Sequence, residues 1–188
     1  MATDPRSSVQ SKKIALLAAL VLAFTVALMR IPVWGFVSDG YTDEQLYALI
    51  GHEMNKGLWP YVDLWDRKPV GLFLIFAFAD LLPMPAPQNY QLVGGVFTFG
   101  GAFLLYLIAR RVANQLTAVG AGVLFILGLF YFGSASGQSE VFHVPLMIAM
   151  VWLLSDIDSD NYLPRAMGAM AIGGIADAAA VAVLLDGV

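Results

Sequence analysis

The sequence predicts an all-α polytopic membrane protein with about five transmembrane helices, and three observations lead to this fold class. Of the 188 residues, 59% are hydrophobic and only 13% are charged, with a mean hydropathy of +0.74. A soluble domain has about 25% charged residues. The apolar residues fall into runs of roughly 14 to 20 residues between short polar joints, as in a helical bundle in lipid. The alternating polarity of a membrane β-barrel is absent.

The composition also excludes several kinds of chemistry. The chain contains no cysteine, so it has neither a disulfide framework nor a thiolate for metal binding or nucleophilic attack. The net charge is −4, but in a membrane protein the positions of Lys and Arg matter more than their sum. There is no glycine motif for nucleotide binding, and we expect no nucleic-acid partner.

The first span is predicted over residues 14–34. The polar segment at the start of the chain is expected to be disordered, and it ends in a basic pair, Lys12 and Lys13, before the apolar run Ile14–Met29. No small-residue cleavage site follows, which favours an uncleaved span over a signal peptide. The segment Arg30–Trp34 is typical of an interfacial edge. We expect a cytoplasmic N-terminus in the cell inner (plasma) membrane.

Residues 35–90 form the one long polar interruption, predicted to be an external loop with interfacial helices. Thr42 to Gln45 fit a capping box, so a helix should begin at Asp43, and Gly57 supplies a stop. Leu46, Ile50 and Met54 recur at four-residue spacing. This stripe predicts an amphipathic helix lying on the membrane. Aromatic residues suited to the headgroup zone follow it at Trp59, Tyr61 and Trp65.

The next apolar run, Val70 to Leu82, is predicted to be an interfacial or re-entrant helix. About 13 residues reach only about 20 Å, against a hydrocarbon core of roughly 30 Å. The run also contains Asp80. If it does not cross, Arg110 and Arg111 lie in the cytoplasm, as the positive-inside rule favours.

The remaining spans are predicted within residues 91–188. They are Leu92–Ala109, Leu116–Phe132, Val141–Leu154 and Ala166–Leu185, with an external loop at 134–140. Glycines in these runs let helices approach closely: Gly94, Gly95, Gly100, Gly101, Gly120, Gly122 and Gly128. Asp177, alone in the last run, has no partner that the sequence identifies.

Asp43 and Glu44 open the predicted loop helix. Acidic residues are favourable in a first helical turn, so helix stability alone could explain them. Their position beside an aromatic belt at the membrane surface also suits contact with a substrate that arrives from lipid.

A second charged cluster contains Asp63, Asp66, Arg67 and Lys68. Cations on the outer side act against the positive-inside bias, and binding of an anionic lipid headgroup would explain Arg67 and Lys68. The alternative is a solvated charge run with internal ion pairs.

Glu140 and His143 share one helical face at the mouth of a span. Ionisable residues at membrane depth usually face a cavity and are functional. An interfacial Glu and a capped His are the simpler alternative. These residue types could bind zinc, but the spacing matches no dedicated metal motif.

Several of these motifs together resemble the N-terminal part of the dolichyl-phosphate-mannose protein mannosyltransferase-like family. They are Asp43-Glu44, Tyr47, the stretch Leu64–Pro69 and Ser139-Glu140. The family consists of membrane glycosyltransferases with the C-type fold, related to the lipid A aminoarabinose transferases. The resemblance covers roughly residues 14–155. Family members are longer, so it implies a truncated C-type architecture, with a missing C-terminal segment or a membrane partner. The second proline of the family's Lys-Pro-Pro segment is Val70 here.

The resemblance implies transfer of a sugar from a polyprenyl-phosphate donor to a lipid, glycan or protein acceptor on the outer face of the membrane, with inversion. It makes Asp43 the base and gives Glu44 the positioning of Asp43 or of the acceptor. Lys68, helped by Arg67, would neutralise the departing lipid phosphate. Asp66 could hold a divalent metal ion or orient Lys68.

On the same reading, Glu140, with His143 beside it, would close the pocket from the far side. The competing hypothesis is a non-catalytic membrane protein. It would be a lipid-binding or flippase-like component, or an inactive truncated homologue that serves as an assembly partner.

Overall fold

The computed structural model describes residues 5–36, 42–155 and 164–173, and this part of the chain consists of helices and their connecting loops. The elements are α1 (Pro5–Arg30), η1 (Ile31–Val33), α2 (Thr42–Asn55), α3 (Val70–Asp80), α4 (Gln88–Ala109), α5 (Gln115–Tyr131) and α6 (Ser139–Leu154). Residues 164–173 are also helical. The predicted all-α class is confirmed for the described residues.

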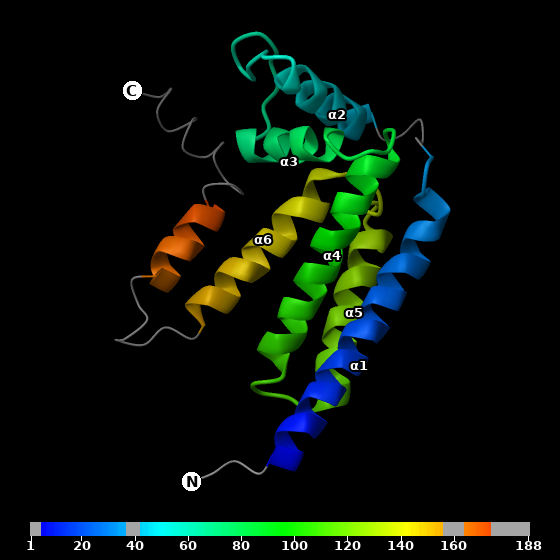
Figure 1. The fold of residues 1–188 in the computed structure, drawn as a ribbon, viewed down its shortest axis with the longest axis vertical. Helices are drawn as coiled ribbons and strands as arrows, with labels where there is room; N and C mark the ends of the chain where they lie inside the picture. Colours follow the sequence, from blue (N-terminus) through cyan, green and yellow to red (C-terminus); the bar gives the residue numbers. More distant parts are fainter. Residues whose placement is uncertain (1–4, 37–41, 156–163, 174–188) are drawn as a thin grey trace.

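Four helices form a bundle, and two shorter ones lie across one of its ends (Figure 1). Helix α4 contacts α1, α5 and α6 along the bundle and α3 at its end, so it is the central element. Helices α2 and α3 pack against each other above the bundle. The segment Val70–Asp80 therefore lies across the bundle end, where an interfacial helix would lie.

Among the described residues, two helical segments are long and apolar enough to cross a membrane, judged by length and composition: Lys12–Val33, which covers most of α1 together with η1, and Gln88–Ala109, which is α4. Helices α5 and α6 are shorter, at 17 and 16 residues. All the runs predicted to be spans are helical where the structure describes them. Of the fifth run, only the part up to residue 173 is described, and Asp177 lies outside the described residues.

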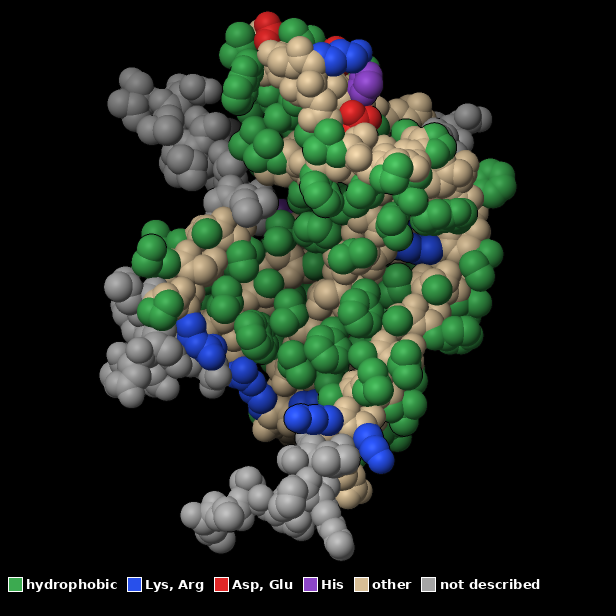
Figure 2. Space-filling model, viewed as in Figure 1, with side chains coloured by type: hydrophobic (Ala, Val, Ile, Leu, Met, Phe, Trp, Pro, Cys, Tyr) green, Lys and Arg blue, Asp and Glu red, His purple; other side chains and the backbone are tan. Residues whose placement is uncertain are grey.

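Lys and Arg side chains gather at the end of the bundle away from α2 and α3 (Figure 2). The cations of the described termini and joints are exposed: Lys12, Lys13, Arg110 and Arg111. The described Asp and Glu side chains visible in the same view lie at the opposite end, where Lys or Arg and His side chains are also visible. The two ends of the bundle thus differ in charge.

Two predictions about α1 are wrong. The helix already begins at Pro5, so residues 5–13 are not disordered; proline is well accommodated in a first helical turn, and no helix breaker separates this segment from the apolar run. Arg30 does not lie at an open interfacial edge but is buried, because it donates hydrogen bonds to groups of α4 and of the α5–α6 connection.

Helix α2 ends as predicted. Gly57 has a φ of +97°. Its N–H donates to Met54 O at 3.0 Å, and the N–H of Leu58 donates to Glu53 O at 3.1 Å, which together form a Schellman motif. The predicted apolar stripe is only partly right. Leu46 is exposed, and the buried residues of α2 are Glu44, Tyr47, Ile50 and Gly51.

The α2–α3 pair depends on a close approach and a polar clamp. A Cβ at Gly51 would lie 2.6 Å from Ala77 N, so the two backbones are almost in contact. At the far end of α3, Asp80 accepts from Asn55 Nδ2 at 3.0 Å and pairs with His52 Nδ1 at 3.0 Å. The acidic residue that the sequence showed in this apolar run therefore links α3 to α2.

The glycines of the bundle divide into two groups. A Cβ at Gly122 would come within 2.9 Å of Ala102 O, and one at Gly101 within 3.0 Å of Pro145 Cβ. Gly94 is similarly crowded by Arg30 and Val141. In contrast, a Cβ at Gly100, Gly120 or Gly128 would meet nothing within 4 Å. The prediction that glycines permit close helix packing thus holds for only some of those named.

Candidate functional site

Tyr47 lies at the centre of the candidate site. Its ring is buried against Phe73 and Phe76 of α3, with centroids 6.2 and 5.6 Å away. Its hydroxyl donates to Asp43 Oδ2, one helical turn earlier, at 3.4 Å. Burial raises the pKa of the Tyr47 hydroxyl, and the negative charges of Asp43, Asp66 and Glu140 raise it further. Asp43 thus contacts the phenol directly, and Asp66 and Glu140 are near enough for their charges to act on it.

Lys68 brings a positive charge to the same place. Its ammonium Nζ lies 5.9 Å from the centroid of the Tyr47 ring and donates to Ser139 Oγ at 3.2 Å. A cation at this distance is attracted by the ring face. The lysine thus connects the segment before α3 with α2 and with the first residue of α6. Residues that are 71 positions apart in the sequence meet here.

The main chain of Lys68 is held in place by its neighbours. Its N–H donates to Asp66 Oδ1 at 2.8 Å, and its carbonyl accepts from the Tyr61 hydroxyl. Tyr61 has a φ of 69°, a left-handed conformation that is uncommon for an aromatic residue. Both side chains around Lys68 therefore act on its backbone and leave the ammonium directed at Ser139.

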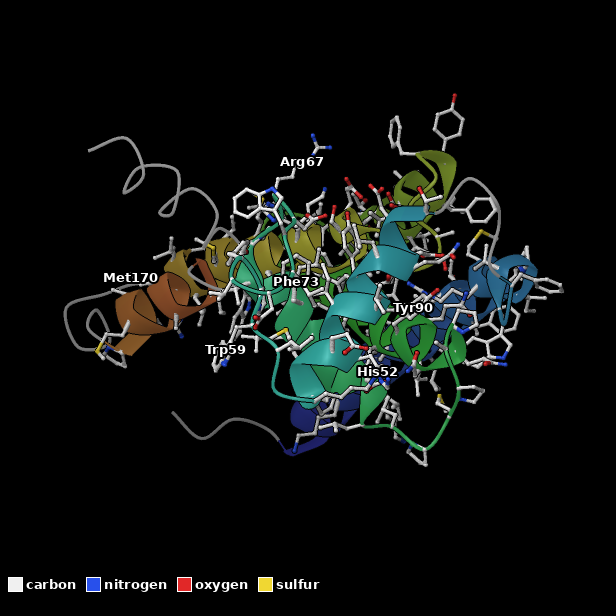
Figure 3. All side chains as sticks on the ribbon, turned by 90° about the horizontal axis from the view of Figure 1, so that it is seen from above. His52, Trp59, Arg67, Phe73, Tyr90 and Met170 are labelled. Atoms are coloured by element: carbon white, nitrogen blue, oxygen red, sulfur yellow. The ribbon has the colours of Figure 1, made fainter. Side chains whose placement is uncertain are left out.

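The loop before Lys68 exposes large apolar side chains. Trp59, Val62 and Trp65 are 67%, 83% and 77% exposed. The loop has local structure of its own: the Trp59 N–H donates to Asp63 Oδ2 at 2.8 Å, and the Asp63 N–H donates to Trp59 O at 2.9 Å. Figure 3 shows Trp59 and Arg67 pointing outward from the fold.

The predicted site residues separate into two groups. Asp43, Asp66, Lys68 and Glu140 come together around Tyr47. Of the other three, Arg67 is exposed and points outward, His143 is partly buried one turn into α6, and Glu44 is fully buried.

Glu44 has a role that the sequence did not reveal. Its carboxylate accepts from Ser136 Oγ at 3.1 Å, from the Gly137 N–H and from the Tyr90 hydroxyl. Burial raises the pKa of Glu44, and the hydrogen bonds and the charge of Arg30 oppose that effect. The side chain is 0% exposed. It joins α2 to the α5–α6 connection and offers no surface to a substrate.

Tyr47 and Ser139 were not predicted to be functional residues, although both belong to the motifs quoted above. Tyr47 follows Asp43 by four residues, a spacing that places both on one helical face. Ser139 directly precedes Glu140, but no local pattern could pair it with Lys68.

Among the described residues, no three His, Asp or Glu side chains are grouped in a way that could hold a metal ion. Asp66, the predicted metal candidate, instead accepts the Lys68 N–H. Both roles predicted for Asp66, metal binding and orientation of Lys68, stay predictions.

A comparison with protein-family models, curated proteins and solved structures finds no match to this chain. The assignment of function therefore depends on the chemistry of the site.

Proposed function

We propose that this chain carries the acceptor-activating and phosphate-binding groups of a membrane glycosyltransferase that uses a polyprenyl-phosphate-linked sugar. The observation that supports it is that Asp43 and Lys68 both contact Tyr47, the first at its hydroxyl and the second over its ring. The exposed carboxylate of Asp43 could accept a proton, and the ammonium of Lys68 could bind a phosphate. Both groups are needed to displace a phosphate from a sugar.

The chemistry assigns one role to each charge. Asp43 accepts the proton of the acceptor hydroxyl as its oxygen bonds to the anomeric carbon. The bond from that carbon to the phosphate oxygen breaks on the opposite face, and its electron pair leaves with the lipid phosphate. Lys68 stabilises the charge that grows there, where electrostatic help lowers the barrier most. The products are an inverted glycoside, a polyprenyl phosphate and a protonated Asp43.

The charge distribution supports an outer location for this site. Lys12, Lys13, Arg110 and Arg111 lie at the other end of the bundle, and cytoplasmic segments are enriched in Lys and Arg. We therefore assign the α2–α3 end to the outer face. Trp59 and Trp65 would then contact the headgroup zone, which Trp favours.

A turnover assay tests the proposal. Membranes that carry the chain are given a polyprenyl phosphate with a radiolabelled sugar, and the release of free polyprenyl phosphate and of labelled acceptor is followed. We expect both products to appear in equal amounts and to depend on Asp43 and Lys68. Binding of the donor without release of either product would contradict the transferase.

A second candidate is a non-catalytic lipid-binding protein, and one observation favours it. A groove of about 410 Å³ runs between α1 and α4. Its walls are mostly apolar, formed by residues such as Val26, Val96 and Phe99, and Arg30 also lines it. The hydrocarbon chain of a membrane lipid fits this chemistry. Retention of lipid by the purified chain, with no turnover in the assay above, would support this candidate.

A further inference from the structure

Arg30, at the end of α1, binds the segment between α5 and α6. Its Nη1 donates to Ser136 O at 3.1 Å and to Gln91 O at 2.9 Å, and its Nη2 donates to Thr98 Oγ1 at 3.2 Å. Arginine is suited to this because its planar guanidinium holds several donors in fixed directions. The side chain is 8% exposed. Three parts of the chain are thus fixed around one buried cation.

Gln91 of α4 supports the same segment. Its Nε2 donates to Ser136 Oγ at 3.0 Å and to Val33 O at 2.8 Å, and its Oε1 accepts from the Gly35 N–H at 2.8 Å. These bonds fold the chain after α1 over the end of α4. Gln91 is fully buried, so each of its bonds replaces one that water would otherwise make.

Ser136 is where these contacts meet α2. Because its Oγ accepts from Gln91, its single hydroxyl proton is the one directed at Glu44 Oε1. Glu44 then accepts hydrogen bonds from Ser136, Gly137 and Tyr90 and donates none, which fits an ionised carboxylate. Ser136 therefore bridges two opposite buried charges, with its carbonyl on Arg30 and its hydroxyl on Glu44.

Gly137 shows how tightly this segment fits. A Cβ there would lie 2.6 Å from Tyr90 Cδ2 and 2.9 Å from Glu44 Oε2. No other residue type leaves room for the main-chain N–H to reach the carboxylate. The segment 136–137 is held by packing as well as by hydrogen bonds.

The network adjoins the proposed site at both of its ends. Glu44 is the neighbour of Asp43 on α2, and Ser136 precedes Ser139, the hydrogen-bond partner of Lys68, by three residues. We propose that Arg30, Gln91, Ser136 and Glu44 are positioning residues that fix Asp43 relative to Lys68. This inference rests on the proposed function, in which the two groups act on one substrate.

The network is sensitive to the loss of any member. Removing the Ser136 hydroxyl takes a hydrogen-bond donor from the buried Glu44 Oε1, whereas Gln91 Nε2 loses one acceptor but keeps Val33 O. Unpaired buried groups are costly, above all when they are charged. The least costly relaxation is for α2 to move until water reaches Glu44, and such a movement separates Asp43 from Lys68.

The test uses Ser136→Ala, with Ser134→Ala as the matched control. Ser134 is also a buried serine of this connection, but it makes none of the bonds described above. The chain has no cysteine, so spin labels can be placed at cysteines substituted for Gln45 on α2 and Tyr131 on α5, both of which are exposed. Double electron–electron resonance in detergent or nanodiscs then measures the distance between the two spin labels, one on each helix.

We expect a narrow distance distribution in the parent chain and in Ser134→Ala, and a broad or shifted one in Ser136→Ala. The turnover number should fall about 10- to 100-fold in Ser136→Ala with little change in KM, because misplacement of a reacting group by about 1 Å is enough for such a loss. Arg30→Lys, which keeps the charge but loses the fork of donors, should give a smaller change in the same direction. It serves as the second variant if Ser136→Ala does not fold.

A distance distribution and a turnover number that are unchanged in both variants would overturn the inference. A parent chain without turnover would contradict the proposed function, and the spin-label distances would still decide whether the network positions α2.

Discussion

At the residue scale, Lys68 carries the most specific expectation. Lys68→Ala should remove about 3 kcal/mol of transition-state stabilisation, the scale for loss of one donor to a developing charge, and turnover should fall accordingly. The same variant should bind polyprenyl phosphate more weakly. Lys68→Arg should recover only part of this, because guanidinium and ammonium differ in geometry. Lys56→Ala, which removes a cation paired with Glu53 at 2.8 Å on the exposed side of α2, is the control. Unchanged donor affinity in Lys68→Ala would favour a solvated charge run.

The pair of Asp80 and His52 gives a pH-dependent prediction. Burial opposes ionisation of Asp80, but hydrogen bonds from Asn55 and His52 and the charges of His52 and Lys56 outweigh it, so its pKa is lowered from the usual value of an aspartate. A lowered pKa stabilises the fold at pH values above the unfolded pKa, and the contribution is lost as the pH falls through the folded one. Asp80→Asn should therefore lower stability at neutral pH.

The expected loss is less than about 1 kcal/mol, because the pair is partly exposed. Thermal unfolding in mild detergent, followed by circular dichroism at neutral pH and at about pH 2.5, measures it. The difference between Asp80→Asn and the parent chain should be smaller at the lower pH. An equal difference at both pH values would mean that ionisation of Asp80 contributes nothing.

At the scale of elements, the two classes of glycine predict opposite effects on α5. Gly122→Ala should destabilise the bundle by about 1 to 3 kcal/mol, because the new methyl group meets the main-chain oxygen of Ala102. Gly120→Ala adds a methyl group in open space and should leave stability unchanged or raise it by up to about 1 kcal/mol, because alanine is the better helix former. Unfolding in a mixed-detergent titration compares them. Equal effects would contradict the packing described for α5.

The helices could be predicted because their signals are local. Hydropathy and helix breakers marked the apolar runs that are helical, though not residues 5–13, and Gly57 ends α2 as its left-handed φ requires. Boundaries were less certain where tertiary contacts decide. Helix α4 begins at Gln88 and not at Leu92, since its polar first turn includes Asn89 and Gln91, which are buried at the bundle end.

The site could be predicted only in part, for a physical reason. Asp43, Asp66, Lys68 and Glu140 were named from short motifs, and all four lie near enough to Tyr47 for their charges to act on it. The burial of Glu44 could not be foreseen, because its partner Gly137 is 93 positions away and the contact depends on how α2 docks. Arg30 was misread for the same reason: its burial requires acceptors from α4 and from the α5–α6 connection.

At the scale of the whole molecule, the polarity of the bundle predicts its orientation in the membrane. A single cysteine can replace Gln88, the first residue of α4, or Asn114, the residue before α5. The two positions are separated by the length of α4. An impermeant thiol reagent added to intact cells should label position 88, whereas position 114 should be labelled only after permeabilisation. The reverse pattern would put the α2–α3 end in the cytoplasm.

The most direct test of the glycosyltransferase assignment is the turnover of Asp43→Asn with a polyprenyl-phosphate-linked sugar. The change keeps the size of the side chain and removes its ability to accept a proton. We expect turnover to fall by at least about 100-fold, with donor binding and expression unchanged. Glu53→Gln, on the same helix but outside the site, should keep full turnover. If Asp43→Asn transfers sugar at the rate of the parent chain, Asp43 is not the base and this loop is not the catalytic site.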